Sequence, residues 1–163
     1  MREFTKGGER VKVEMLNWTP APERTVALSA RLCYSPVGIG ELQEKLGRAE
    51  VERLLGMVIS RGHHSVLEHA SFTFGIEGVS RALTHQLVRH RLASYSQQSQ
   101  RHVQKEEFEY VVPPSVAANG EARHVFQQAM EQARKAYSTL LGMGIHREDC
   151  RYVIPQGVET KIV

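Results

Sequence analysis

The part of the sequence richest in chemically useful side chains is the segment from Gln86 to His102, which contains no carboxylate. It supplies three guanidinium groups, at Arg89, Arg91 and Arg101, whose planar forks suit bidentate contacts to phosphate oxygens. Hydroxyl and amide groups between them could contact a base edge. These are Ser94, Ser96, Ser99, Gln86, Gln97, Gln98 and Gln100. The combination indicates a cradle for a nucleotide phosphate, and a solvated basic loop is the alternative that composition alone leaves open.

The distribution of charge supports an anionic partner more strongly than its total. The chain has 21 basic and 18 acidic residues, a net charge of +3 and a pI near 9.0. Six of the eight histidines lie between His63 and His102, among several arginines. We therefore expect a negatively charged ligand to bind the middle of the chain.

Hydrophobic periodicity predicts the elements that must position these groups. A helix over 79–93 would place Gln86 and Arg89 on one face, with His90 pointing elsewhere. The other expected elements are a largely buried strand around 11–16, a helix from Pro22 to about Leu32, a loop over 35–40, a helical stretch over 41–59 broken near Gly47, a strand over 72–76, a polar loop over 94–100, a strand over 103–112 and a helix over 122–141.

Length and composition predict one α+β domain over residues 1–163, with a mixed or antiparallel sheet flanked by helices. The chain is 41% hydrophobic and 24% charged, which is typical of a globular protein. It contains no apolar run near the roughly 20 residues that span a bilayer. The first residues lack the apolar core of a secretory signal, and Cys33 and Cys150 are isolated. We expect a cytoplasmic protein with no membrane partner.

Several segments resemble the flavin-dependent thymidylate synthases. The family pattern R-H-R-x-x-S-x-x-x-x-S-x-R is complete in this chain. It is carried by Arg89, His90, Arg91, Ser94, Ser99 and Arg101. The segments 63–69, 30–34 and 151–155 are also similar to that family, so the resemblance runs from about residue 10 to the end.

The resemblance implies reductive methylation of dUMP to dTMP, with methylenetetrahydrofolate as carbon donor and NADPH as hydride source through bound FAD. The dUMP contacts that it implies are Gln86, Arg89, Gln97, Ser99, Arg101 and Arg151. The FAD contacts that it implies are His63, Ser65, Glu68, Arg89, His90, Arg91 and Gln97. It further implies a homotetramer whose sites combine residues of several subunits.

The chain departs from the family pattern in two places. His102 stands where the family usually has tyrosine. Family members also continue beyond the segment that matches 151–155 into a portion whose last arginine helps to activate the pyrimidine, whereas this sequence ends at Val163. We therefore expect a truncated form or a short relative with partial or no activity, and we assign no catalytic residue within the chain.

Other interpretations compete with this one. His64 and Glu68, with His63 and His69 nearby, could ligate zinc, but the sequence lacks H-E-x-x-H and we assign no metal. A non-catalytic nucleotide- or nucleic-acid-binding domain is the alternative function, although no nucleic-acid-binding signature is present and we expect no nucleic-acid partner.

Possible nucleophiles and the remaining histidines are given simpler roles. Cys33 and Cys150 are interpreted as small buried residues, and Ser99 as a ligand contact with no base beside it. His85 and His124 are expected on helices and receive no function.

Overall fold

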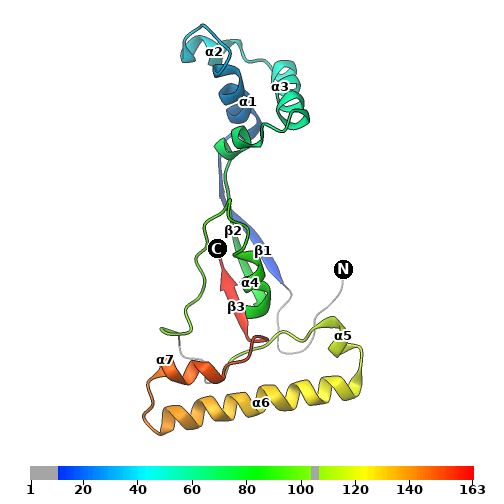
Figure 1. The fold of residues 1–163 in the computed structure, drawn as a ribbon, viewed down its shortest axis with the longest axis vertical. Helices are drawn as coiled ribbons and strands as arrows, with labels where there is room; N and C mark the ends of the chain where they lie inside the picture. The colour runs from blue at the N-terminus through cyan, green and yellow to red at the C-terminus, as the bar shows by residue number, and fades with distance from the viewer. Residues whose placement is uncertain (1–10, 104–106) are drawn as a thin grey trace. The chain divides into compact units, whose positions relative to one another are not determined.

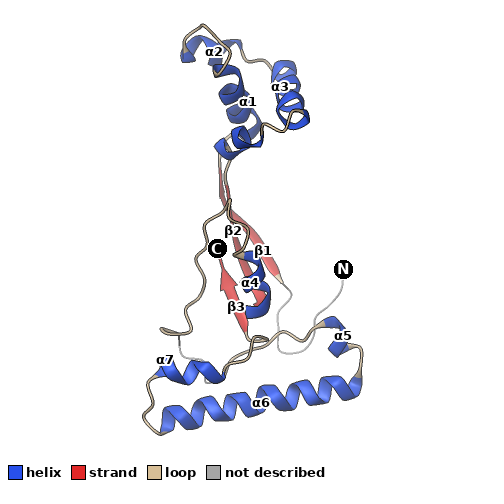
Figure 2. Cartoon of the chain, in the orientation of Figure 1, coloured by secondary structure: helices blue, strands red, loops and turns tan. Residues whose placement is uncertain are grey.

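A computed structural model describes residues 11–103 and 107–163, which form two compact units (Figure 1). One unit comprises Met15–Phe74, and the other comprises the described residues of Gly75–Val163 together with residues 11–14. Helices and strands both contribute, as the α+β prediction requires (Figure 2). Within the described residues, no helix combines the length and apolar character needed to cross a membrane. The single-domain expectation stays a prediction.

The Met15–Phe74 unit is built from helices around a small apolar core. It contains α1 (Pro22–Leu32), α2 (Ile39–Lys45), α3 (Arg48–Ser60) and the 3-10 helix η1 (His64–His69). The predicted helices are confirmed, with Pro22 in the first turn of α1 and a break at Gly47, but α2 begins inside the expected 35–40 loop. Ala27 of α1 and Leu54 of α3 are buried against Leu46.

A sheet of β1 (Lys12–Trp18), β2 (Phe72–Ser80) and β3 (Glu159–Ile162) has the order β1-β2-β3 in the described part of the chain. β2 pairs antiparallel with β3, and the register is irregular between Ile76 and Val79. The predicted first strand is present, but its expected burial is wrong because all seven of its residues are exposed. An apolar strand pattern indicates which residues could be buried. It does not show whether another part of the chain covers them.

The helix α4 (Arg81–Leu87) is much shorter than the predicted 79–93 helix. Val79 belongs to β2, and the Ser80 side chain caps α4 by accepting a hydrogen bond from the backbone N–H of Leu83 at 3.2 Å. The helix ends at Leu87, so Arg89 to Arg91 lie in the turn that follows it. The expectation that Gln86 and Arg89 share a helix face is therefore wrong.

The C-terminal helices are α5 (Pro114–Ala117), α6 (Gly120–Gly142), α7 (Arg147–Cys150) and the 3-10 helix η2 (Arg151–Val153). α6 confirms the predicted long helix. Asn119 caps it by accepting a hydrogen bond from the backbone N–H of Ala122 at 3.0 Å. Met130 and Tyr137 are its buried side chains.

The predicted strand over 103–112 falls partly on residues 104–106, which lie outside the described residues. In the described remainder, strand pairing is limited to an isolated bridge between Tyr110 and Val158. The prediction of a regular strand is therefore wrong there. The Phe108 side chain is buried, and its backbone carbonyl accepts a hydrogen bond from Arg134 Nε at 3.0 Å. Contacts with α6 thus replace strand pairing at this residue.

Candidate functional site

The polar loop predicted over 94–100 is fixed to the end of β3. Ser96 and Val163 exchange two backbone hydrogen bonds, each 2.9 Å long, and the N–H of Gln98 donates to the carbonyl of Lys161 at 3.0 Å. Gln97 lies between them and forms an isolated antiparallel bridge with Ile162. The backbone of the loop is therefore held in an extended conformation beside the sheet.

The Gln97 side chain is bonded within its own unit. Its Nε2 donates to the hydroxyl of Thr84, which is fully buried in α4, and lies 3.4 Å from the hydroxyl of Thr160 on β3. Thr84 in turn donates to the carbonyl of Arg81 at 2.9 Å. These bonds connect the loop, α4 and β3. They also occupy the side-chain NH2 group of Gln97, a residue expected to contact the ligand.

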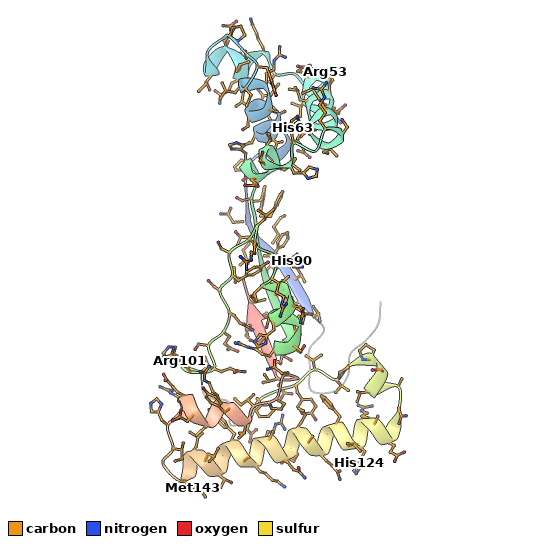
Figure 3. The ribbon with its side chains drawn as sticks, in the orientation of Figure 1. Arg53, His63, His90, Arg101, His124 and Met143 are labelled. Carbon is orange, nitrogen blue, oxygen red and sulfur yellow. The ribbon has the colours of Figure 1, made fainter. Side chains whose placement is uncertain are left out.

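Arg89, His90 and Arg91 form an exposed turn after α4. His90 is labelled in Figure 3. The backbone N–H of His90 donates to Leu87, and the Tyr95 hydroxyl donates to the carbonyl of His90, both at 3.1 Å. Neither Arg89 nor Arg91 forms an ion pair with any residue in the described ranges. Their charges, like the exposed Gln86 amide, are available to a ligand.

Arg101 and Arg151 both contact Glu148 of α7, and Ser99 is bonded to Arg101. Arg101 Nε forms an ion pair with a Glu148 carboxylate oxygen at 3.1 Å, and Arg151 Nε donates to the Glu148 backbone carbonyl at 3.0 Å. The Ser99 hydroxyl accepts from the backbone N–H of Arg101 at 3.1 Å. The hydrogen bond from Arg101 lowers the pKa of Glu148, and the charges of Arg101, His146 and Arg151 act in the same direction.

Arg151 also lines a pocket of about 280 Å³ on the Gly75–Val163 unit. Among the described residues, its lining contains no acidic side chain. It consists of Arg81, His85, Gln100, Arg151, Tyr152, Ile154, Pro155 and Gln156. Burial lowers the pKa of Arg81, and the positive charge of Arg151 lowers it further. Two guanidinium groups on a concave surface, with no carboxylate among the described lining residues, form a site suited to an anion.

Sequence reasoning identified Arg151 and placed Gln100 among the amides that could contact a base edge, but it missed other polar side chains of this pocket, among them Arg81, His85 and Tyr152. Arg81 and His85 precede the Gln86 to His102 segment, and His85 was expected on a helix without a function. The spacing of four residues between Arg81 and His85 was the available signal, because such residues are neighbours on a helix.

The remaining predicted residues lie in the Met15–Phe74 unit. His63 directly precedes η1, and Ser65 and Glu68 lie within it, all three with exposed side chains. Among residues 11–103 and 107–163, no group of three His, Cys, Asp or Glu side chains is arranged to hold a metal ion.

The two cysteines differ in their environments. Cys150 is fully buried, as expected, and its thiol contacts the carbonyl of Ile145 at 3.3 Å. Cys33 is exposed, so its expected burial is wrong. The reason is that α1 ends at Leu32 and Cys33 lies in the turn beyond the buried face of the helix.

Known proteins of similar sequence indicate the family to which the chain belongs. The family described as "Thymidylate synthase complementing protein" matches residues 14–163. The chain is 56% identical over 155 residues to the flavin-dependent thymidylate synthase of Geobacter sulfurreducens, covering 94% of this chain and 67% of that protein. It is 49% identical over 179 residues to the flavin-dependent thymidylate synthase of Clostridium tetani, covering 100% of this chain and 71% of that protein.

A solved structure has a similar fold. It is the UMP/dUMP methylase PolB of Streptomyces cacaoi bound with 5-Br dUMP, with a TM-score of 0.76 and 22% identity over 94% of this chain and 71% of that one. The likeness confirms the α+β fold class. The chain belongs to the thymidylate synthase complementing protein family. The resemblance to flavin-dependent thymidylate synthases is thereby confirmed, and the chain spans about two thirds of the length of these relatives.

Proposed function

We propose that this chain acts in the reductive methylation of dUMP to dTMP. Methylenetetrahydrofolate gives its one-carbon group to C5 of the pyrimidine and leaves as tetrahydrofolate. NADPH is oxidised to NADP⁺, C5 loses its proton, and one proton is taken up overall. The single observation that carries the proposal is that Glu148 links Arg151 to the family-motif residue Arg101, which is bonded to Ser99, beside a pocket with no acidic side chain among its described lining residues.

The dUMP phosphate is the part of the substrate that this site suits best. Arg151 lines the pocket, and Arg101 is joined to it through Glu148. Guanidinium groups held in fixed positions bind a dianionic phosphate with little ordering cost. The remaining dUMP contacts in the proposal are Gln86, Arg89, Gln97 and Ser99. No residue of this chain is assigned to activating the pyrimidine.

The turn after α4 fits the anionic part of a flavin dinucleotide. Arg89 and Arg91 are exposed and form no ion pair within the described ranges, so their guanidinium groups could hold the pyrophosphate without losing a carboxylate partner. When bound, the flavin supplies the hydride relay between NADPH and the substrate. The other residues proposed to contact FAD are His63, Ser65, Glu68, His90 and Gln97.

The proposal includes a homotetramer in the cytoplasm. The exposed apolar side chains of β1, including Val13, Met15 and Trp18, support association, because such a surface is stabilised when another chain covers it. The mass of the chain in solution, measured by light scattering, tests this part. A monomeric mass at all accessible concentrations would contradict the proposed homotetramer.

The visible absorption spectrum tests the flavin and nucleotide assignments together. The purified chain is incubated with FAD, freed of unbound cofactor and examined with and without dUMP. We expect retained flavin absorbance that dUMP perturbs. A colourless chain that gains thermal stability from dUMP would restrict the function to nucleotide binding. A colourless chain indifferent to dUMP would contradict the proposal.

A further inference from the structure

Arg81 and His85 form a hydrogen-bonded pair on the exposed side of α4. Arg81 Nε donates to His85 Nε2 at 3.0 Å, across one turn of the helix. In this bond His85 Nε2 is the acceptor of the Arg81 Nε hydrogen. Donation through Nε fixes the plane of the guanidinium and leaves its two Nη groups for other partners.

The position of Arg81 is also fixed through its backbone. Its N–H donates to the carbonyl of Val158 at 2.9 Å, and the next N–H, of Ala82, donates to Gln156 at 3.0 Å. These bonds attach the start of α4 to the segment that leads into β3. Arg81 therefore enters the pocket from an anchored helix end, and His85 restrains its side chain.

Arg81 and Arg151 line the same pocket from different elements. Arg81 forms no ion pair with any residue in the described part of the chain, and the charge of Arg151 acts on it directly. Like charges held close together repel, and an anion bound between them relieves the repulsion. The charge of Arg101, by contrast, is paired with the Glu148 carboxylate. Arg81 therefore gains more than Arg101 from a bound anion.

We propose that His85 is a positioning residue for substrate binding: by accepting from Arg81 Nε, it holds the Arg81 guanidinium where Arg81 and Arg151 together bind the 5′-phosphate of the nucleotide. The inference rests on the proposed dUMP site and adds a second guanidinium and its support to it. Neither residue belongs to the motif that led to the site.

Three variants test the role of His85 by isothermal titration with dUMP. His85→Leu removes the acceptor, His85→Gln retains a side-chain oxygen that can accept from Arg81, and His124→Leu makes the same change at an exposed position of α6. We expect dUMP affinity to fall about five- to tenfold in His85→Leu. We expect a change of no more than about twofold in His85→Gln, and unchanged affinity in His124→Leu.

A double-mutant cycle tests whether His85 acts through Arg81. Arg81→Lys retains the charge and loses the Nε donor, so we expect it to weaken dUMP binding about as much as His85→Leu. The double variant should then be no weaker than Arg81→Lys alone. Additive losses would overturn the inference, and Arg81→Lys with His85→Gln keeps the test available if His85→Leu does not fold.

The outcomes separate this inference from the proposed function. A wild-type chain that binds dUMP while His85→Leu binds it equally tightly would overturn the role of His85 and leave the dUMP site intact. Equal weakening in His85→Leu and His85→Gln would also overturn it, because acceptance from Arg81 would then not be the cause. A wild-type chain that binds no dUMP would refute the proposed function and this inference with it.

Discussion

The arginines proposed to bind ligands form two groups that are held in different ways. Arg101 forms an ion pair with the Glu148 carboxylate, and Arg151 donates a hydrogen bond to the Glu148 backbone carbonyl. Arg89 and Arg91 project from a turn with exposed side chains and have no carboxylate partner in the described ranges. The first group has partners within the chain, whereas we expect the second group to be ordered by its ligand.

This difference assigns different energetic roles to the same residue type. Immobilising an arginine side chain costs up to about 2 kcal/mol of conformational entropy, which the fixed arginines have largely lost on folding. A ligand that meets Arg101 and Arg151 therefore has a smaller ordering cost than one that meets Arg89 and Arg91. We expect the first pair to set the affinity for dUMP, and the second pair to affect flavin retention with little influence on the fold.

The largest effect is expected from Arg151→Ala. Loss of a charge-assisted hydrogen bond costs about 1.5–3 kcal/mol, so dUMP affinity should fall about 10- to 150-fold. Isothermal titration measures it, with Arg48→Ala as the control because Arg48 is an exposed arginine in the other unit. If both variants bind dUMP like the wild type, Arg151 is not part of the site.

Thr84→Val tests the anchor that connects α4, the loop and β3. The Thr84 hydroxyl is fully buried and joins the Arg81 carbonyl to Gln97 Nε2, so its loss leaves both without that partner. We expect the free energy of unfolding to fall by about 1–3 kcal/mol, as measured by urea denaturation. Thr139→Val, at an exposed position of α6, should change it by less than about 0.5 kcal/mol. Equal stability of the two variants would contradict the anchoring role.

Arg91→Ala should separate ligand binding from stability. Because Arg91 is exposed and forms no ion pair within the described residues, we expect the free energy of unfolding to change by less than about 0.5 kcal/mol. FAD affinity, measured by flavin fluorescence, should fall about fivefold or more. A large loss of stability with unchanged FAD affinity would contradict the assignment of Arg91 to ligand binding and would indicate a structural role instead.

Glu148→Gln should produce the smallest effect, visible in the pH dependence of stability. Arg101 lowers the pKa of Glu148 in the folded chain below its ordinary value of 4.5. A carboxylate with a lowered folded pKa stabilises the fold above its unfolded pKa and loses that contribution as the pH falls through the folded value. The difference in thermal unfolding midpoint between wild type and variant should therefore be present at pH 7 and vanish in acid.

Glu50→Gln provides the matched comparison for that measurement. Glu50 of α3 has a pKa lowered by its hydrogen bond from Arg53, but it lies in the other unit and far along the chain from the motif arginines. Its pH dependence should resemble that of Glu148→Gln, whereas dUMP should shift only the Glu148 profile. A dUMP-dependent shift in both would mean that Glu148 has no special connection to the site.

The sequence predicted elements whose signals are local. α6 follows from its helical spacing and the Asn119 cap, and α1 from Pro22 and its apolar stripe. The length of α4 was missed because the chain continues β2 to Ser80, a residue that then caps the helix. Periodicity over a short apolar segment does not distinguish these two states.

The composition of the site depended on contacts between distant segments. Arg101 and Glu148 are separated by 47 positions, and Gln97 and Thr160 by 63. The arginines could be identified from their motif, but nothing in the spacing indicated that Glu148 would neutralise one of them or that Arg81 would share a pocket with Arg151. Those facts depend on how the loop, α4 and α7 pack.

The Arg101–Glu148 ion pair has a consequence for how binding responds to ionic strength. Dissolved salt screens the attraction between an exposed arginine and a phosphate, so each unpaired arginine at a site steepens the dependence of affinity on salt concentration. Arg101 is already neutralised by a carboxylate of its own chain, so an arriving phosphate exchanges partners with Glu148. The salt dependence of dUMP binding should therefore be shallower than the number of arginines around the site suggests.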